Sequence, residues 1–166
     1  MKELEQIAEL IGEIHKTRFM LEKIDVFYRE FKESDFAVLG KKRTTGIILA
    51  EILTDFYTCV ETLFLRISQF FENSLKPDKW HSELLRKMTI DIEGVRKAVI
   101  SDQSYAILVE LMKFRHFKRY YFEFDYDWDK LEFLEKKYND VRYLLNKDLD
   151  AFESFLKAQN LPVYIA

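Results

Sequence analysis

An apolar heptad repeat through residues 2–33 leaves little choice of fold for this chain. Its apolar positions form two rows, Ile7, Ile14, Leu21 and Tyr28 in one and Leu10, Thr17, Ile24 and Phe31 in the other. Charged side chains fill most of the remaining positions, so the pattern predicts one long amphipathic helix with a narrow apolar seam. Such a seam is buried by packing along another helix. We therefore expect this segment to belong to a helical bundle.

Three further segments carry apolar side chains at helical spacing, at residues 46–73, 103–121 and 128–158, and a shorter one starts at Trp80. Segment 46–73 is broadly apolar, which is typical of a helix at the centre of a bundle. The chain has only four glycines and two prolines in 166 residues, which disfavours an all-β sandwich. Because brief links make neighbouring helices antiparallel, we predict a single all-α domain over residues 1–166, an up-and-down bundle of four long helices plus one short helix.

Several residues are expected to begin or end these helices. Asp78, Ser101 and Asp127 are predicted N-terminal caps, because a short polar side chain there accepts a hydrogen bond from a free backbone N–H. A break is expected at Gly94, and Pro162 is expected to stop the last helix. The apolar stripe of segment 103–121 is predicted to continue to its end, through Phe117 and Tyr121.

The charge balance limits the kinds of partner that this chain can bind. Its net charge is −3, which disfavours a general nucleic-acid coat, so anion binding must be local. Residues 34–44 interrupt the helical spacing and contain the basic triplet Lys41, Lys42 and Arg43. This triplet could contact phosphate, or it could be a solvated loop.

The chain is expected to be cytoplasmic. Its single cysteine, Cys59, excludes a disulfide framework, and residues 1–5 do not resemble the start of a signal peptide. No uncharged apolar run approaches the ~20 residues needed to cross a bilayer. Aromatic residues make up 16% of the chain, which favours a protein interface in addition to the core.

Residues 114–128 combine basic and aromatic side chains more densely than any other stretch. Arg115 and Arg119 are four residues apart and share one face of a helix, whereas Lys118 lies well round from that face. Two neighbouring guanidinium groups need an anion between them, which could be a phosphate or a structural carboxylate. The structural candidates are acids of the last helix and the nearby Glu123, Asp125 and Asp127.

Several stretches together resemble the HEPN superfamily, in particular its HepT-like, toxin-type branch. They are residues 55–61, 77–88, 94–101, 114–131 and 148–156, and their order and spacing agree with the family. The resemblance implies a helical bundle that forms a homodimer, with two arginine-bearing helices facing each other across a cleft. Family members that are toxins cut RNA without a metal or cofactor. Their usual partner is a small nucleotidyltransferase of the MNT type, which acts as the antitoxin.

The family's active motif is an arginine followed, after four to six residues, by a histidine. In this chain Arg115 matches the arginine, His116 matches the polar residue that follows it, and Arg119 matches a second arginine common in the branch. Tyr120 stands where the catalytic histidine is expected. Phe122 stands where a tyrosine is usual. Both differences from the family motif, at Tyr120 and Phe122, therefore fall on residues that would take part in catalysis.

Metal-free RNA cleavage needs a base for the 2′-hydroxyl, positive charge at phosphorus and an acid for the leaving oxygen. Histidine suits proton transfer because its pKa is near ~6.5, and arginine suits the phosphate. Tyrosine, with a pKa near ~10, is a poor base but can donate a proton. The catalytic candidates are Arg115, His116, Arg119 and Tyr120, and the phosphate-binding candidates are Arg115, Arg119 and Lys118. In a dimer, His116 of one chain could face Arg115 of the other.

Other interpretations remain open from the residues. The chain could be a non-catalytic HEPN module that binds a nucleotidyltransferase or an anionic nucleotide, with Tyr120 or Tyr121 as a modification site. It could also be a purely structural bundle. His81 is expected to cap its helix or be solvated beside a core Trp80, and His15 is expected to be solvated. No histidine pair has metal-binding spacing and no Gly-rich phosphate loop is present.

Overall fold

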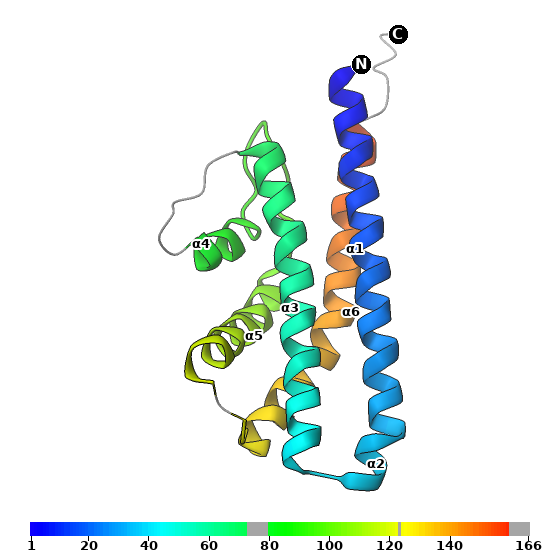
Figure 1. Cartoon of the computed structure of the whole chain (residues 1–166). Coiled ribbons are helices and arrows are strands. Elements are labelled where there is room, and N and C mark those ends of the chain that lie inside the picture. Colours follow the sequence, from blue (N-terminus) through cyan, green and yellow to red (C-terminus); the bar gives the residue numbers. More distant parts are fainter. Residues whose placement is uncertain (73–79, 123, 160–166) are drawn as a thin grey trace.

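The computed structural model describes residues 1–72, 80–122 and 124–159, and within them it is an all-α bundle without strands (Figure 1). The helices are α1 (Lys2–Glu33), α2 (Asp35–Leu39), α3 (Arg43–Phe71), α4 (Trp80–Lys87), α5 (Asp102–Tyr121) and α6 (Trp128–Gln159). The predicted all-α bundle is confirmed, and the four long helices lie where the apolar spacing placed them. The five-residue helix α2 lies inside the interruption at residues 34–44.

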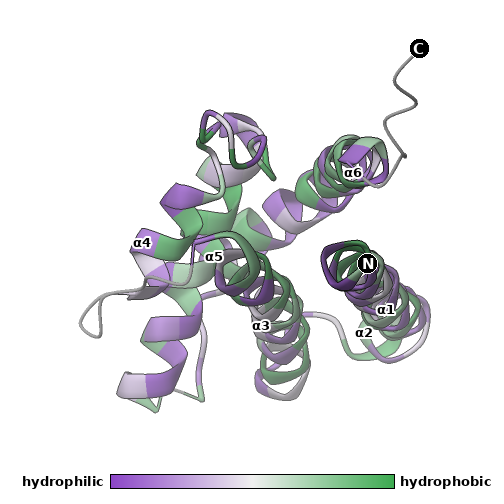
Figure 2. Cartoon of the chain, turned by 90° about the horizontal axis from the view of Figure 1, so that it is seen from above, coloured by the Kyte–Doolittle hydropathy of each residue, from purple (hydrophilic) through white to green (hydrophobic). Residues whose placement is uncertain are grey.

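Helix α3 is the centre of the bundle and contacts every other helix. The antiparallel helix α1 lies beside α3 together with α6, and α4 and α5 lie on the other side of α3 (Figure 1). Figure 2 shows α1, α3 and α6 largely along their axes, whereas α5 lies across them. This crossing gives α5 a different packing from the other long helices: its buried residues end at Arg115, and its last turns are not covered by the bundle.

The apolar seam of α1 is buried as predicted. Six of its eight positions are buried, namely Ile7, Leu10, Ile14, Thr17, Tyr28 and Phe31. Leu21 and Ile24 are half-buried and pack against the core. The seam faces α3 and α6, where the Tyr28 ring meets the Tyr138 ring edge-on at 5.0 Å between centroids. The heptad therefore identified the buried face of a long helix, which is what a narrow apolar stripe requires.

Two of the predicted helix starts are confirmed. The Ser101 hydroxyl accepts a hydrogen bond from the Ser104 N–H, and Asp127 Oδ1 accepts one from the Asp129 N–H at 2.9 Å. Gly94 lies at the expected break, where its φ of +72° is one that residues with a Cβ seldom adopt. The predicted cap at Asp78 and the predicted stop at Pro162 lie outside the described residues.

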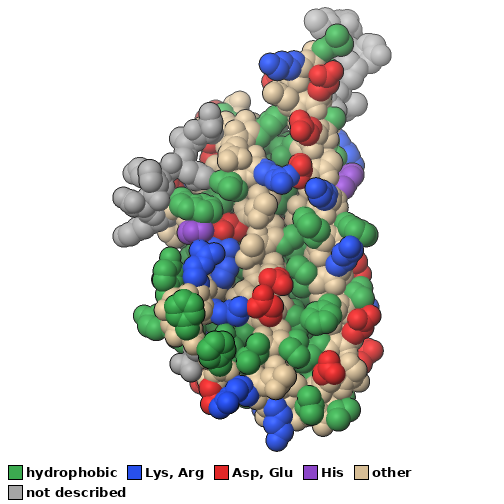
Figure 3. Space-filling view, in the orientation of Figure 1, with side chains coloured by type: hydrophobic (Ala, Val, Ile, Leu, Met, Phe, Trp, Pro, Cys, Tyr) green, Lys and Arg blue, Asp and Glu red, His purple; other side chains and the backbone are tan. Residues whose placement is uncertain are grey.

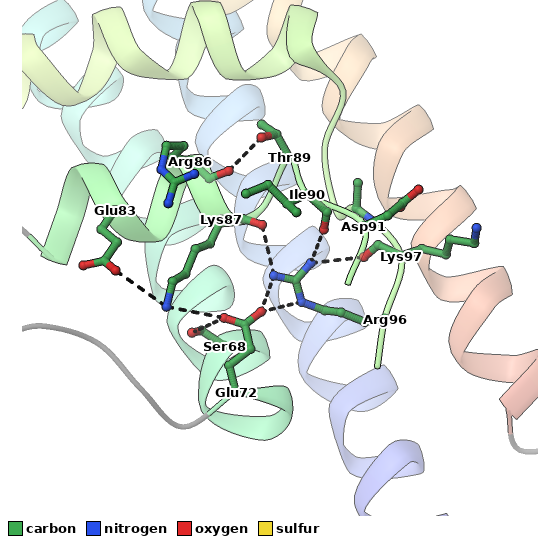
Figure 4. A network of polar contacts seen from close by, with 11 residues as sticks. Ser68, Glu72, Glu83, Arg86, Lys87, Thr89, Ile90, Asp91, Arg96 and Lys97 are labelled. Carbon is green, nitrogen blue, oxygen red and sulfur yellow. Dashed lines mark hydrogen bonds and ion pairs between the residues drawn. The ribbon is translucent and has the colours of Figure 1, made fainter. Parts of the chain in front are cut away.

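A buried ion pair ties the end of α4 to the end of α3 (Figure 4). Arg96 is buried, and its Nε and Nη2 both donate to the Glu72 carboxylate. Its Nη1 donates to the carbonyls of Ile90 and Lys97, and Nη2 also donates to the carbonyl of Lys87. All five N–H groups of the guanidinium thus have acceptors. The pair fixes the carboxyl end of α4 and so the position of the whole short helix.

Within the ranges that the structure describes, no helix is long and apolar enough to span a membrane.

Candidate active site

One pocket lies between the start of α4 and the middle of α5. Its volume is about 460 Å³. It is lined by His81, Ser82, Met112, Lys113, Arg115, His116, Arg119 and Tyr120. Figure 3 shows a histidine, basic side chains and an acidic side chain close together over this side of the molecule. The structure therefore brings the four catalytic candidates from the sequence to one pocket.

Arg115 forms the inner wall of this pocket and is buried. Its Nη2 lies 2.9 and 3.0 Å from the two carboxylate oxygens of Glu61 on α3, and its Nη1 donates to the Thr58 hydroxyl at 3.2 Å. The guanidinium also lies over the Tyr57 ring, at 4.7 Å from its centroid. One alternative from the sequence, a structural carboxylate beside Arg115, is thus present. It comes from the central helix, and within the described residues neither Asp125, Asp127 nor an acid of α6 pairs with Arg115.

Glu61 is the shared acceptor at the base of the site. It is buried, and it accepts hydrogen bonds from Arg115 and His81. Tyr57 also hydrogen-bonds to it, and burial, together with the Glu61 charge, raises the pKa of the Tyr57 hydroxyl well above its usual range. Tyr57 therefore stays protonated and keeps donating to Glu61. A buried carboxylate with several donors is held in one orientation.

His81 is a site residue that sequence reasoning missed. Its Nδ1 lies 2.8 Å from Glu61 Oε2 and 3.3 Å from Arg115 Nη2, so it belongs to the same polar cluster. The Trp80 ring lies against the imidazole, at 3.6 Å between centroids. We expected His81 to cap its helix or be solvated, and this expectation was wrong because a partner on α3 faces it. The contact joins residues twenty positions apart, which no local spacing reveals.

The outer wall of the pocket is formed by exposed residues of α5. His116, Arg119 and Tyr120 are all exposed, and the His116 and Tyr120 rings lie 4.5 Å apart between centroids. Across the described parts of the chain, no carboxylate pairs with Arg119. Arg119 is thus a cation that faces the pocket, whereas the charge of Arg115 is balanced by Glu61.

Lys118 and Tyr121 do not line the pocket. The Lys118 ammonium lies 2.6 Å from Glu51 Oε2 on α3. Tyr121 is 68% exposed and stacks on Phe117. The structure therefore separates Lys118 from the two arginines with which the sequence grouped it as a phosphate contact.

The carboxyl end of α5 carries an exposed aromatic patch, which we define as Phe117, Tyr120, Tyr121, Phe122 and Phe124. The predicted apolar stripe does run along α5 to Tyr121, but Phe117 and Tyr121 at its end are exposed. Because α5 crosses α3, its last turns extend past the bundle that would cover them (Figure 2). The helix ends at Tyr121, and the residue that follows, Phe122, has a left-handed φ of +49°.

The remaining candidates from the sequence lie away from the pocket. In the basic triplet, Lys41 pairs with Glu132 of α6 and Arg43 pairs with Asp125. His15 is mostly exposed, but its Nε2 contacts Glu153 of α6 and it is therefore not simply solvated. Residues 1–72, 80–122 and 124–159 contain no group of three or more His, Cys, Asp or Glu side chains placed to hold a metal ion.

Comparison with known proteins places the chain in a family. A family model described as HepT-like protein matches residues 48–156, a range that covers well over half of the chain and includes all of the pocket residues. No curated protein and no solved structure gave a match. The matched range contains α4, α5 and nearly all of α3 and α6, and so the polar cluster of Glu61, His81 and Arg115. The chain therefore belongs to the HepT-like protein family.

Proposed function

We propose that the chain is the toxin component of a toxin–antitoxin pair and acts as a metal-independent endoribonuclease at the pocket between α4 and α5. The proposal draws on the resemblance to HEPN toxins, whose ribonuclease members use an arginine and nearby polar residues on one helix. One observation carries it. Arg115, His116, Arg119 and Tyr120, which the resemblance assigns to the site, line a single pocket.

In this proposal the exposed Arg119 binds the scissile phosphate. Its guanidinium is a fixed donor that stabilises the charge developing on the phosphate oxygens. Arg115 is already paired with Glu61, so its main role is to hold the inner wall. His116 can donate a proton to the leaving oxygen, and Tyr120 can donate a hydrogen bond.

The proposed enzyme works as a homodimer. The aromatic patch at the end of α5 is exposed next to the pocket, and exposed aromatic side chains are typical of protein interfaces. A second copy seated on this patch would bring two pockets together and cover the apolar surface. An RNA strand would then lie in the cleft between the two α5 helices.

The ribonuclease proposal is tested with the purified full chain and a fluorescently labelled single-stranded RNA, in buffer containing EDTA. Cleavage should proceed and leave 2′,3′-cyclic phosphate and 5′-hydroxyl ends. Arg119→Ala should lower the rate on the order of 10²–10³-fold. Arg66→Ala is the matched control, because Arg66 is also an exposed arginine but pairs with Glu13 of α1, away from the pocket. An unmodified parent chain that leaves RNA intact would refute the proposal.

A second function is favoured by the exposure of two tyrosines beside the site. Tyr120 is 60% exposed and Tyr121 is 68% exposed, so both hydroxyls can reach the active site of another protein. In this case the chain is a non-catalytic HEPN module that a nucleotidyltransferase partner binds, transferring a nucleotidyl group to one of these hydroxyls. Mass spectrometry of the chain after co-expression with an MNT-type nucleotidyltransferase tests this function. The modification should disappear in the Tyr120→Phe, Tyr121→Phe double variant.

A further inference from the structure

The pocket has a tyrosine at the motif position where a base is expected, so its base must come from elsewhere. Two histidines line the pocket, His116 on α5 and His81 on α4. They differ in how the protein holds them. Their contacts indicate which one is suited to accept a proton.

We propose that His81 is the general base of this pocket and that Glu61 orients it. This inference rests on the proposed ribonuclease function. His81 Nε2 takes the proton of the RNA 2′-hydroxyl, and the 2′-oxygen attacks phosphorus. The bond between phosphorus and the 5′-oxygen breaks, and the 5′-oxygen takes a proton from His116. The products are a 2′,3′-cyclic phosphate and a 5′-hydroxyl, and His81 then returns its proton to water.

The contact with Glu61 sets which nitrogen of His81 is free. Nδ1 lies 2.8 Å from Glu61 Oε2, which is an acceptor, and farther, 3.3 Å, from the donor Arg115 Nη2, which donates to the two Glu61 oxygens at 2.9 and 3.0 Å. The shorter contact places the hydrogen of the neutral ring on Nδ1. The other tautomer would place a nitrogen lone pair against a carboxylate oxygen. Nε2 is therefore left with the lone pair that a base needs. The imidazole is partly exposed, and His81 lines the pocket, so this edge of the ring is accessible.

Glu61 can orient His81 because Glu61 is itself fixed. It is buried, and Arg115 Nη2 contacts both of its oxygens, at 2.9 and 3.0 Å. The Trp80 ring covers one face of the imidazole. A base whose orientation is set by a second, buried group is a recurrent arrangement in acid–base catalysis. Arg115 and Glu61 are thus positioning residues, and His81 is the group that meets the substrate.

His116 lacks such support. Among the described residues its ring meets only the Tyr120 ring, and no protein group there forms a hydrogen bond with it. Nothing selects one of its tautomers. Its exposed position suits proton donation to a leaving oxygen more than a preorganised base. The groups that face His81 are Glu61 of α3 and Arg115 of α5, with Lys113, His116, Arg119 and Tyr120 of α5 around the same pocket.

The decisive variant is His81→Asn, because the asparagine amide N–H can replace Nδ1–H toward Glu61 while Nε2 is lost. We expect the cleavage rate to fall about 10²–10⁴-fold, with the melting temperature and RNA affinity unchanged. The rise of the rate with pH that reports a base should be lost in this variant and retained in His116→Asn. If His81→Asn cleaves within twofold of the parent, His81 is not the base although the ribonuclease function stands. If the parent itself does not cleave RNA, the proposed function fails, and the base role fails with it.

A second measurement does not depend on activity. The chain has three histidines, so ¹⁵N-histidine NMR can assign the His81 signals by their loss in His81→Asn. At a pH where the ring is neutral, the ¹⁵N shifts should show the hydrogen on Nδ1 of His81. Glu61→Gln should move His81 toward the mixture of tautomers found in free histidine. A parent chain with the hydrogen on Nε2 overturns the inference.

Discussion

Two buried arginine–glutamate pairs connect α3 to the segments that follow it. They differ in the exposure of the arginine and in whether its hydrogen bonds stay within the pair and the backbone. The Arg96 side chain is 0% exposed, and all five of its N–H groups reach acceptors on Glu72 and three backbone carbonyls. The Arg115 side chain is 11% exposed, and its contacts with Glu61 are shared with a histidine at the edge of a pocket. We call Arg96–Glu72 the closed pair, because every N–H group of its guanidinium is bonded within the protein. We call Arg115–Glu61 the open pair, because it lies at a pocket where it can meet a ligand.

The two pairs act on opposite ends of the same short helix. Arg96 binds the carboxyl end of α4 through the Lys87 carbonyl (Figure 4). Glu61 binds its amino end through His81. Leu84 and Leu85 are buried between these two ends. An eight-residue helix has little stability of its own, so such anchors decide where it lies. We infer that the closed pair serves stability and that it holds α4 where the open pair can use His81.

The largest effect is expected from opening the closed pair. Arg96→Ala leaves Glu72 charged and nearly buried with Lys87 as its remaining ion-pair partner, at 4.0 Å. We expect a loss of about 3–5 kcal/mol in the free energy of unfolding, measured by urea denaturation. Arg86→Ala is the control, because Arg86 is an exposed arginine of α4, and it should change stability by less than about 0.5 kcal/mol. A loss for Arg96→Ala as small as the control would contradict the structural role of this pair.

A smaller loss of stability is expected from the open pair. In Arg115→Met, Glu61 keeps the hydrogen bonds from His81 and Tyr57, so we expect a loss of about 1–3 kcal/mol. Its cleavage rate should nevertheless fall further than that of Arg96→Met when both are assayed at a temperature where they are folded. Urea denaturation and the RNA cleavage assay measure the two quantities. The distinction between the pairs fails if Arg115→Met costs as much stability as Arg96→Met.

High pH tests the open pair through its tyrosine. Burial, and then the Glu61 charge, raise the pKa of Tyr57 in the folded chain, whereas the unfolded chain has an ordinary tyrosine pKa of about 10. Above pH 10 the unfolded state therefore loses a proton that the folded state keeps, and the stability that the neutral hydroxyl supplies declines as pH rises. Tyr57→Phe should lower the free energy of unfolding by about 0.5–1.5 kcal/mol at pH 8, because a hydrogen bond is lost. Between pH 9 and 11, however, the stability of this variant should decline less than that of the parent chain. Urea denaturation at each pH measures this, and parallel declines of parent and variant would refute it.

The difference between the two pairs also marks what the sequence could predict. The apolar periodicity of α1, α3 and α6 located their buried faces, because a helix of fixed pitch exposes or covers residues by their spacing. Arg115, His116, Arg119 and Tyr120 could be grouped for the same reason, since they lie within two turns of one helix. Glu61 and His81 could not, because they come from other helices and meet Arg115 only through the way α5 crosses α3. The same crossing leaves Phe117 and Tyr121 exposed although their spacing matches a core stripe.

The smallest effect is expected at Lys118, which tests whether proximity in sequence or placement in the pocket decides phosphate binding. Lys118 stands one residue from Arg119, but its ammonium pairs with Glu51, whose side chain is 57% exposed. Ion pairs this close to solvent contribute about 0–1 kcal/mol, so Lys118→Ala should change the free energy of unfolding by no more than that. RNA affinity, measured by fluorescence anisotropy at two salt concentrations, should fall clearly in Arg119→Ala and only slightly in Lys118→Ala. Equal losses in the two variants would mean that bound RNA extends round α5 to α3, and that the phosphate contacts reach beyond the pocket.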